Sequence, residues 1–290
     1  MKAQLIRTFY RSLGPVPYPV AARALEHFFA NPLLQKTLYK KSLRPLQRFL
    51  GAPPDRHQAI QYLLANHAND WRLSALAKLE NADFERVVTI EGLHHLQGET
   101  DSESGAGVIL ANTHHGASRC VPISLARSGI QLTSLESHDV LAKIGAANRQ
   151  NLNVVEVGKG EGFVLKQVRK VQKLLKGGGI LHIVPDGLQG SSGTPLPFLG
   201  RERPFATSFA ELAVDTGARV VPVSSALDSQ GRVTIELHPP LPAPDKDALR
   251  SAKINGLLHA YVDFLQQRWR TTPENIRQHH LHFYQKLPII

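Results

Sequence analysis

A polar loop with two adjacent histidines follows a strongly apolar segment near the middle of the chain. The apolar segment is 107–111, and the loop runs from Asn112 to Cys120 with His114 and His115 near its start. A neutral imidazole takes a proton from an alcohol or amine near pH 7, because a free imidazole titrates close to that pH. We therefore predict that His114 is a general base. The alternative is a strand-end turn whose histidines only satisfy backbone groups.

The residues directly after these histidines are of the types that an oxyanion site needs. Gly116 permits close approach of the backbone to a substrate, and a predicted helix begins near residue 117. The N–H groups at the start of a helix favour negative charge. We expect the backbone of Gly116, Ala117 and Ser118 to stabilise an oxyanion, and Arg119 to contact the substrate.

A second polar loop follows the apolar segment 180–184. It contains Asp186 and Gln189, and Arg201 and Arg203 come shortly after it. The planar guanidinium group suits phosphate recognition, so we expect these arginines to hold a phosphate of the donor or acceptor. Gln189 is expected to contact the substrate. The alternative is a loop in which Asp186 only shapes a turn.

Apolar segments alternate with segments of helical periodicity from about residue 85 onward. Strands are expected near 87–90, 107–111, 131–135, 154–157, 180–184, 220–223 and 232–236, and helices near 117–128, 139–149, 162–176, 204–216 and 246–269. The alternation predicts an α/β fold with a mainly parallel sheet covered by helices. Ligands bind outside the carboxyl ends of such strands, where both polar loops are expected.

Residues 1–84 form a predicted helical region that is more basic than the rest of the chain. The first 50 residues hold nine Lys and Arg against one acidic residue, whereas residues 51–290 hold 25 against 23. Interrupted amphipathic helices are expected over 20–50, ahead of an α/β domain at 85–290 with which they form one compact unit. A basic amphipathic region suits an anionic membrane surface or an acidic carrier protein.

The order and spacing of four segments resemble a known enzyme family. The segments are the histidine loop, the run GGGILHIVPDG at 177–187, the run PFLGR at 197–201, and the part of 210–223 that holds Thr-Gly-Ala and Val-Pro-Val. Together they resemble the bacterial lipid A late acyltransferases of the lauroyl and myristoyl type. These belong to the wider lysophospholipid and glycerol-phosphate acyltransferase-like superfamily. The similarity runs from about residue 85 to 265.

The resemblance implies a glycerol-phosphate acyltransferase-like fold and a specific reaction. A fatty acyl group passes from the thioester of an acyl carrier protein or coenzyme A to a hydroxyl or amine, with that thioester as co-substrate and no further cofactor. In the family a histidine is the base, and a carboxylate five residues later orients it. The resemblance places His114 at the histidine. Arg119 then occupies the carboxylate position, and a start at His115 puts Cys120 there.

Neither residue supplies the expected carboxylate, and a guanidinium group cannot accept a hydrogen bond from the imidazole. Three alternatives follow: another carboxylate substitutes, His114 acts alone, or the site is repurposed or inactive. We favour retained activity on an altered substrate. The competing functions are a non-catalytic acyl- or lipid-binding module and a thioesterase that uses water as acceptor. The candidate substitutes at strand ends are Asp186, Asp139 and Glu136.

The remaining composition narrows the function classes. One cysteine excludes a disulfide framework and a four-thiolate metal site, and we expect no bound metal. His279, His280 and His282 are expected in a solvated tail. Charge alone, without a recognition motif, does not support a nucleic-acid partner. Since no apolar stretch approaches the roughly 18 residues of a spanning helix, we expect a cytoplasmic protein, soluble or peripheral on the inner membrane.

Overall fold

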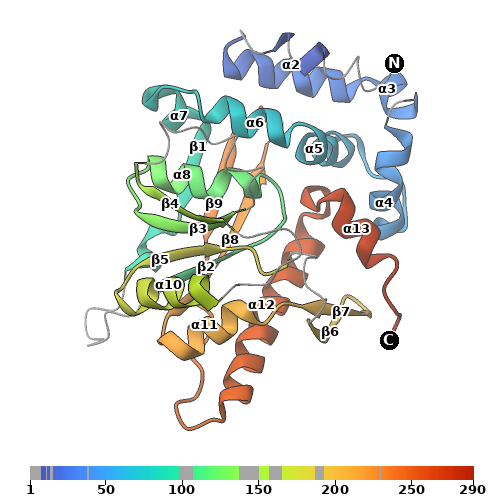
Figure 1. Cartoon of the computed structure of the whole chain (residues 1–290). Coiled ribbons are helices and arrows are strands. Elements are labelled where there is room, and N and C mark those ends of the chain that lie inside the picture. The colour runs from blue at the N-terminus through green and yellow to red at the C-terminus, as the bar shows by residue number, and fades with distance from the viewer. Residues whose placement is uncertain are drawn as a thin grey trace.

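A central sheet covered by helices on both faces organises the molecule (Figure 1). The computed structural model describes residues 8–10, 12–13, 16–37, 39–97, 107–136, 150–156, 165–186, 193–228 and 230–290. Within these ranges the strands are β1 (Val88–Glu91), β2 (Val108–Asn112), β3 (Leu132–Glu136), β4 (Leu152–Glu156), β5 (Ile180–Ile183), β6 (Thr194–Phe198), β7 (Arg201–Phe205), β8 (Arg219–Leu227) and β9 (Val233–Leu237).

Helices precede the sheet, connect its strands and close the chain. The α-helices are α2 (Tyr18–Ala30), α3 (Pro32–Thr37), α4 (Lys40–Leu50), α5 (Arg56–His67), α6 (Asn69–Leu76), α7 (Asn81–Val87), α8 (Val121–Arg127), α10 (Leu165–Lys176), α11 (Ser208–Thr216), α12 (Arg250–Thr271) and α13 (Gln278–Tyr284). Short 3₁₀ turns are η1 (Leu93–Leu96), η2 (Ser118–Cys120) and η4 (Pro273–Asn275). Helices thus lie ahead of and between the strands, as the sequence predicts.

The described residues form a seven-stranded mixed sheet in the order β1-β9-β8-β2-β5-β3-β4. The pairs β8–β2, β2–β5, β5–β3 and β3–β4 are parallel, and β9 runs antiparallel to β8. The predicted mainly parallel α/β sheet is therefore confirmed. Because β2, β5, β3 and β4 share one direction, the loops after them lie along the same edge of the sheet.

The β2 strand lies inside the sheet, between β8 and β5, and both of its faces are covered. All five residues of Val108–Asn112 are buried, which is the pattern of an internal parallel strand. Val108 and Leu110 pack into the hydrophobic core on one face, and Ile109 and Ala111 pack into the core on the other. The two-residue periodicity of a strand thus supplies two cores, and the end of β2 is held rigidly between them.

A second, smaller sheet was not expected from the sequence. Residues 194–198 and 201–205 form the antiparallel hairpin β6–β7, and α11 begins at Ser208 rather than near 204. The strands were not expected because they contain Pro195, Pro197 and Pro204, and proline is rare inside sheets. In an isolated two-stranded ribbon both strands are edge strands, so proline is accepted where the backbone N–H would not pair. The helix expected at 139–149 lies outside the described residues.

The N-terminal helices and the sheet share one hydrophobic core. Leu25 and Phe29 of α2 belong to the same buried cluster as Val121 and Leu125 near α8. The hydroxyl of Tyr18 donates to the Gly231 carbonyl at 2.7 Å, beyond the end of β8. Within the described residues, no helix is both long enough and apolar enough to span a bilayer.

Candidate functional site

His114 and Asp186 come together because their strands are neighbours. β2 and β5 are parallel with Ala111 opposite Ile183, and each strand ends in a polar loop on the same edge of the sheet. His114 lies two residues beyond the end of β2, and Asp186 lies three residues beyond the end of β5. The register of two strands therefore brings together side chains that are 72 positions apart in sequence.

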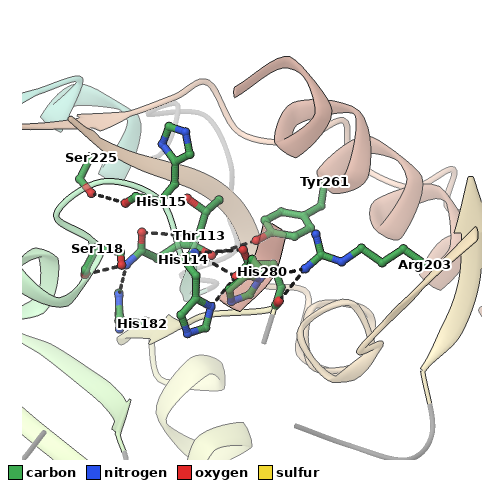
Figure 2. A network of polar contacts seen from close by, with 11 residues as sticks. Thr113, His114, His115, Ser118, His182, Arg203, Ser225, Tyr261 and His280 are labelled. Carbon is green, nitrogen blue, oxygen red and sulfur yellow. Dashed lines mark hydrogen bonds and ion pairs between the residues drawn. The ribbon is translucent and has the colours of Figure 1, made fainter. Parts of the chain in front are cut away.

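Both the backbone and the side chain of His114, which is labelled in Figure 2, make close contacts with Asp186. His114 Nδ1 is 2.8 Å from Asp186 Oδ1, and the His114 backbone N–H donates to both carboxylate oxygens at 3.0 Å. The Asp186 side chain is 1% exposed, whereas that of His114 is 33% exposed. Asp186 thus supports the ring from inside the protein while part of the ring remains open to solvent.

The electrostatic surroundings keep Asp186 ionised although it is buried. Burial alone raises the pKa of a carboxyl group. Here the charge and hydrogen bond of His114, together with His280 and Arg203, outweigh burial and hold the pKa of Asp186 well below its ordinary value. A carboxylate accepts hydrogen bonds and does not donate them, so His114 carries its proton on Nδ1 and leaves Nε2 as an acceptor.

Arg203 lies behind Asp186 and holds the chain there. Its Nη2 donates to the Asp186 carbonyl at 2.9 Å and lies 3.3 Å from His280 Nδ1. The guanidinium carbon lies 4.8 to 5.4 Å from the ring centres of Phe198, Phe205 and Trp269. Only 1% of Arg203 is exposed. We expected this residue to hold a phosphate, but its described contacts are with the protein interior.

His280 packs directly against the His114 ring. The two ring centres are 4.7 Å apart and the rings are inclined by 28°. His280 is 1% exposed, so the prediction that it belongs to a solvated tail is wrong. The reason is that α13 folds back over the edge of the sheet, which the polar sequence around its histidines did not indicate. Burial, the largest cause, holds the pKa of His280 well below its ordinary value, which favours the neutral ring.

His115 and Gly116 turn away from His114 and fix the loop to the protein. His115 Nε2 donates to the Thr272 carbonyl at 3.0 Å, and burial lowers the His115 pKa to about 4. Gly116 has a φ of +56°, and a Cβ there would lie 2.0 Å from the Ser225 carbonyl oxygen. Its N–H donates to Asn275 at 2.7 Å. The close approach that requires this glycine is to the protein backbone.

A buried polar chain supports the other side of the loop. Asn112 Oδ1 accepts from the Thr113 N–H, which fixes the amide so that Nδ2 donates to the Ser118 carbonyl and to His182 Nε2. His182 Nδ1 then carries the proton and donates to Ser134 Oγ at 2.8 Å, and that hydroxyl donates to Glu136 at 2.6 Å. This chain joins the ends of β2, β5 and β3.

Sequence reasoning overlooked this polar chain. A histidine inside the apolar strand 180–184 was a usable signal, because a polar side chain in a buried strand needs a partner. Burial lowers the pKa of His182 to about 3. Burial also raises the pKa of Glu136, and the Ser134 hydrogen bond and the charges of Arg119 and His114 only partly offset this increase. Glu136 contacts Ser134 and lies 3.8 Å from His182.

The remaining predicted residues take different places. Ala117 and Ser118 are buried at the start of η2, and Arg119 is half-buried beside them. Arg201 Nη1 donates to the Leu287 carbonyl at 2.6 Å, which ties the hairpin to the C-terminal segment. Gln189 and Asp139 lie outside the described residues.

His114, Asp186 and His280 also have donor atoms close enough for one cation. Their candidate ligand atoms lie within 4.8 Å of one another. The Arg203 guanidinium is 3.3 Å from His280 Nδ1, and its positive charge opposes a cation at this point. The set therefore suits proton handling better than metal binding.

Comparison with protein families identifies the family to which the chain belongs. The model of the bacterial lipid A biosynthesis acyltransferases matches residues 3–272. The chain belongs to this family. Membership places it among acyltransferases of lipid biosynthesis, which implies an acyl donor as substrate. No curated protein is significantly similar to the chain.

Proposed function

We propose that this lipid A acyltransferase family member transfers a fatty acyl group from a thioester to a hydroxyl or amine of a lipid A-type acceptor. His114 is the general base in this proposal, and Asp186 orients it. The observation that carries the proposal is the 2.8 Å contact between His114 Nδ1 and the buried Asp186 carboxylate. The carboxylate comes from the next strand and not from the loop that carries the histidine.

The proposed base atom is His114 Nε2. Asp186 accepts the Nδ1 proton, so the lone pair of the neutral ring is on Nε2. The acceptor hydroxyl or amine gives its proton to Nε2 while its oxygen or nitrogen attacks the thioester carbonyl carbon. The tetrahedral intermediate then collapses, the carbon–sulfur bond breaks, and the imidazolium returns the proton to the leaving thiolate. The cycle needs no further reactant.

The loop after β2 is the proposed site for the developing oxyanion. The Gly116 N–H already donates to Asn275, so this part of the proposal depends on the N–H groups of Ala117 and Ser118. The Asn112–His182–Ser134 chain holds the Ser118 carbonyl in place. Donors that are fixed before the reaction stabilise the transition state without reorganisation, which is why a rigid loop suits this role.

The arginines are proposed to have separate roles. Arg203 positions Asp186 through its backbone carbonyl, and the half-buried Arg119 is proposed to contact a negatively charged group of the substrate. Gln189 and Arg201 remain proposed substrate contacts. The position of Arg119 where the family motif has a carboxylate supports an altered acceptor.

The N-terminal helices are the proposed membrane-facing surface, which makes the protein peripheral on the inner membrane. Val20 on α2 is 57% exposed and Leu33 on α3 is 71% exposed. Arg23 and Lys36, three positions further along the same helices, are exposed, and basic side chains near an anionic membrane contribute about 1 kcal/mol each. We expect Leu33→Ser to lower co-sedimentation with anionic vesicles. Equal sedimentation of the variant and the wild type would contradict this surface.

The reaction is tested with a labelled lauroyl thioester and an under-acylated lipid A precursor. The proposal predicts a product heavier than the precursor by one acyl group, detected by mass spectrometry, together with one thiol released per acyl group. Both signals should disappear without the precursor. Free fatty acid released at the same rate without the precursor would instead identify a thioesterase.

Thioester binding without product or free fatty acid would identify the binding module and overturn the proposal. A lipid acceptor without phosphate and a simple amine acceptor are tested beside the precursor. They show whether the acceptor lies outside the lipid A class.

A further inference from the structure

α10 is a basic helix with no acidic residue. Its sequence LKQVRKVQKLLK carries five basic residues, and each of them has another three or four positions away. Residues with that spacing lie along one side of an α-helix. At 1.5 Å per residue, these 12 residues form a basic stripe about 18 Å long. The members of this α10 stripe are Lys166, Arg169, Lys170, Lys173 and Lys176.

The whole α10 stripe faces solvent, and the protein does not neutralise it. All five side chains are exposed, and within the described part of the chain none forms an ion pair or a hydrogen bond. The apolar side of the helix packs against the protein, since Val171 and Leu175 are buried in one of the two hydrophobic cores that flank the sheet. Five unpaired like charges on one helix are unfavourable to one another, so a partner of opposite charge gains affinity there.

The stripe begins at the edge of the sheet where the reaction is proposed. α10 follows β4, and the Gln167 side chain donates to the Glu156 carbonyl at the end of that strand. β4 ends on the same edge as β2 and β5, which carry His114 and Asp186. A partner lying along α10 therefore reaches the same edge of the sheet as the proposed base.

A membrane is a poor match for this helix. Interfacial helices insert exposed apolar side chains beside their basic ones. None of the exposed large apolar side chains among the described residues lies on α10, whereas Val20 and Leu33 lie on the N-terminal helices. Figure 1 shows α10 and α2 on opposite faces of the sheet. One flat surface that contacts α2 therefore does not also cover α10.

We propose that the α10 stripe is the docking surface for an acidic carrier protein that presents the acyl thioester to His114. The inference rests on the proposed function, which requires a thioester donor. It adds the place on the molecule where an acidic protein that carries the donor docks. Rim charges of this kind mainly raise the association rate and the apparent affinity and leave the chemical step unchanged.

A double charge reversal tests the surface with two donors that share one acyl group. Lys170→Glu with Lys173→Glu is compared with wild type, using lauroyl carrier protein and lauroyl coenzyme A with the same lipid A precursor. The KM for the carrier protein should rise about tenfold or more with kcat within about twofold, and the KM for coenzyme A should stay the same. The matched control is Arg86→Glu with Lys246→Glu, two exposed basic residues outside α10 and outside the proposed membrane-facing surface, and it should leave both KM values unchanged.

Direct binding separates this inference from the proposed function. The dissociation constant of lauroyl carrier protein is measured by titration at low and at high salt, which needs no turnover. Weaker binding by the α10 variant, and a smaller salt dependence than wild type, support the surface even if no acceptor is acylated. An inactive wild type therefore counts against the proposed function alone.

Three results would overturn the inference. The first is unchanged carrier-protein binding in the α10 variant. The second is an equal rise of KM for both donors, which would indicate contact with coenzyme A phosphates or a general structural defect. The third is loss of binding to anionic phospholipid vesicles by the α10 variant with carrier-protein binding intact, because that would make α10 a membrane surface.

Discussion

At the scale of single residues, the site is a histidine whose partner carboxylate comes from another strand. The sequence resemblance led us to expect that carboxylate five residues after the histidine, at the position of Arg119. Asp186 contacts the same ring at 2.8 Å from the neighbouring β5 strand. A hydrogen bond from Nδ1–H to a carboxylate is defined by geometry and not by sequence position, so either source satisfies the chemistry.

Asp186→Asn tests whether this carboxylate orients the base. The amide removes the negative charge, and its N–H can donate to His114 Nδ1, which favours the tautomer that carries its proton on Nε2. We therefore expect kcat for acyl transfer to fall by about 100-fold or more. The exposed Asp247→Asn is the control and should match wild type. The rates are measured at saturating donor. A wild-type rate in the Asp186→Asn variant would contradict the assignment of Asp186 as the orienting carboxylate.

At the scale of elements, the positions of His114 and Asp186 follow from a pattern that is readable in the sequence. Apolar strands with polar loops at their carboxyl ends predicted the sheet and the edge on which both residues lie. The pairing itself was not readable, because β2 and β5 are separated by β3 and β4 in the chain and their adjacency depends on how the strands are ordered in the sheet.

The elements that sequence reasoning missed are those with long-range partners. The β6–β7 hairpin has prolines within its strands, and α13 carries several polar histidines, so neither shows the periodicity of a buried element. Both acquire their place through tertiary contacts, as when Arg203 reaches from β7 to Asp186 and His280 packs on His114. Propensity is a weak guide where such contacts decide the structure.

Arg203→Met tests the hairpin as the support of Asp186. Methionine keeps much of the apolar contact with the three aromatic rings but leaves the Asp186 carbonyl and the buried carboxylate without the guanidinium. We expect kcat to fall at least tenfold with little change in KM, and the free energy of unfolding to fall by roughly 3 kcal/mol. The control is Arg232→Met, because the Arg232 side chain is 61% exposed and its ion pair is with Asp228, four positions earlier in the chain.

A loss of stability in Arg203→Met without any change in kcat would show that the hairpin is structural only. A change in the pH profile of kcat would favour the positioning role, because a general packing defect does not alter the titration of the reacting groups.

At the scale of the whole molecule, several histidines are buried neutral and make folding sensitive to acid. Burial lowers the pKa of His115 to about 4 and that of His182 to about 3, from an ordinary value of 6.5. Below pH 6.5 the unfolded chain binds protons at these positions that the folded protein does not bind. The free energy of unfolding therefore falls as the pH is lowered from 6.5 toward 4.

Urea unfolding between pH 7 and pH 4 measures this effect. The shift at His115 alone corresponds to a loss of about 3 kcal/mol, because each pKa unit is worth about 1.4 kcal/mol. His115→Gln keeps a donor for the Thr272 carbonyl without the titration, so its stability should fall less steeply with acid. The exposed His259→Gln should follow wild type. A flat profile for wild type would contradict the neutral buried state.

The central claim is that the His114 ring removes a proton from the acceptor. The most direct measurement is the rate of acyl transfer from a lauroyl thioester to the lipid A precursor by His114→Ala, at saturating substrates, beside wild type and the exposed-site control His259→Ala. We predict at least a hundredfold loss for His114→Ala, in line with the usual worth of a general base, and no loss for the control. Turnover by His114→Ala equal to wild type would contradict the account.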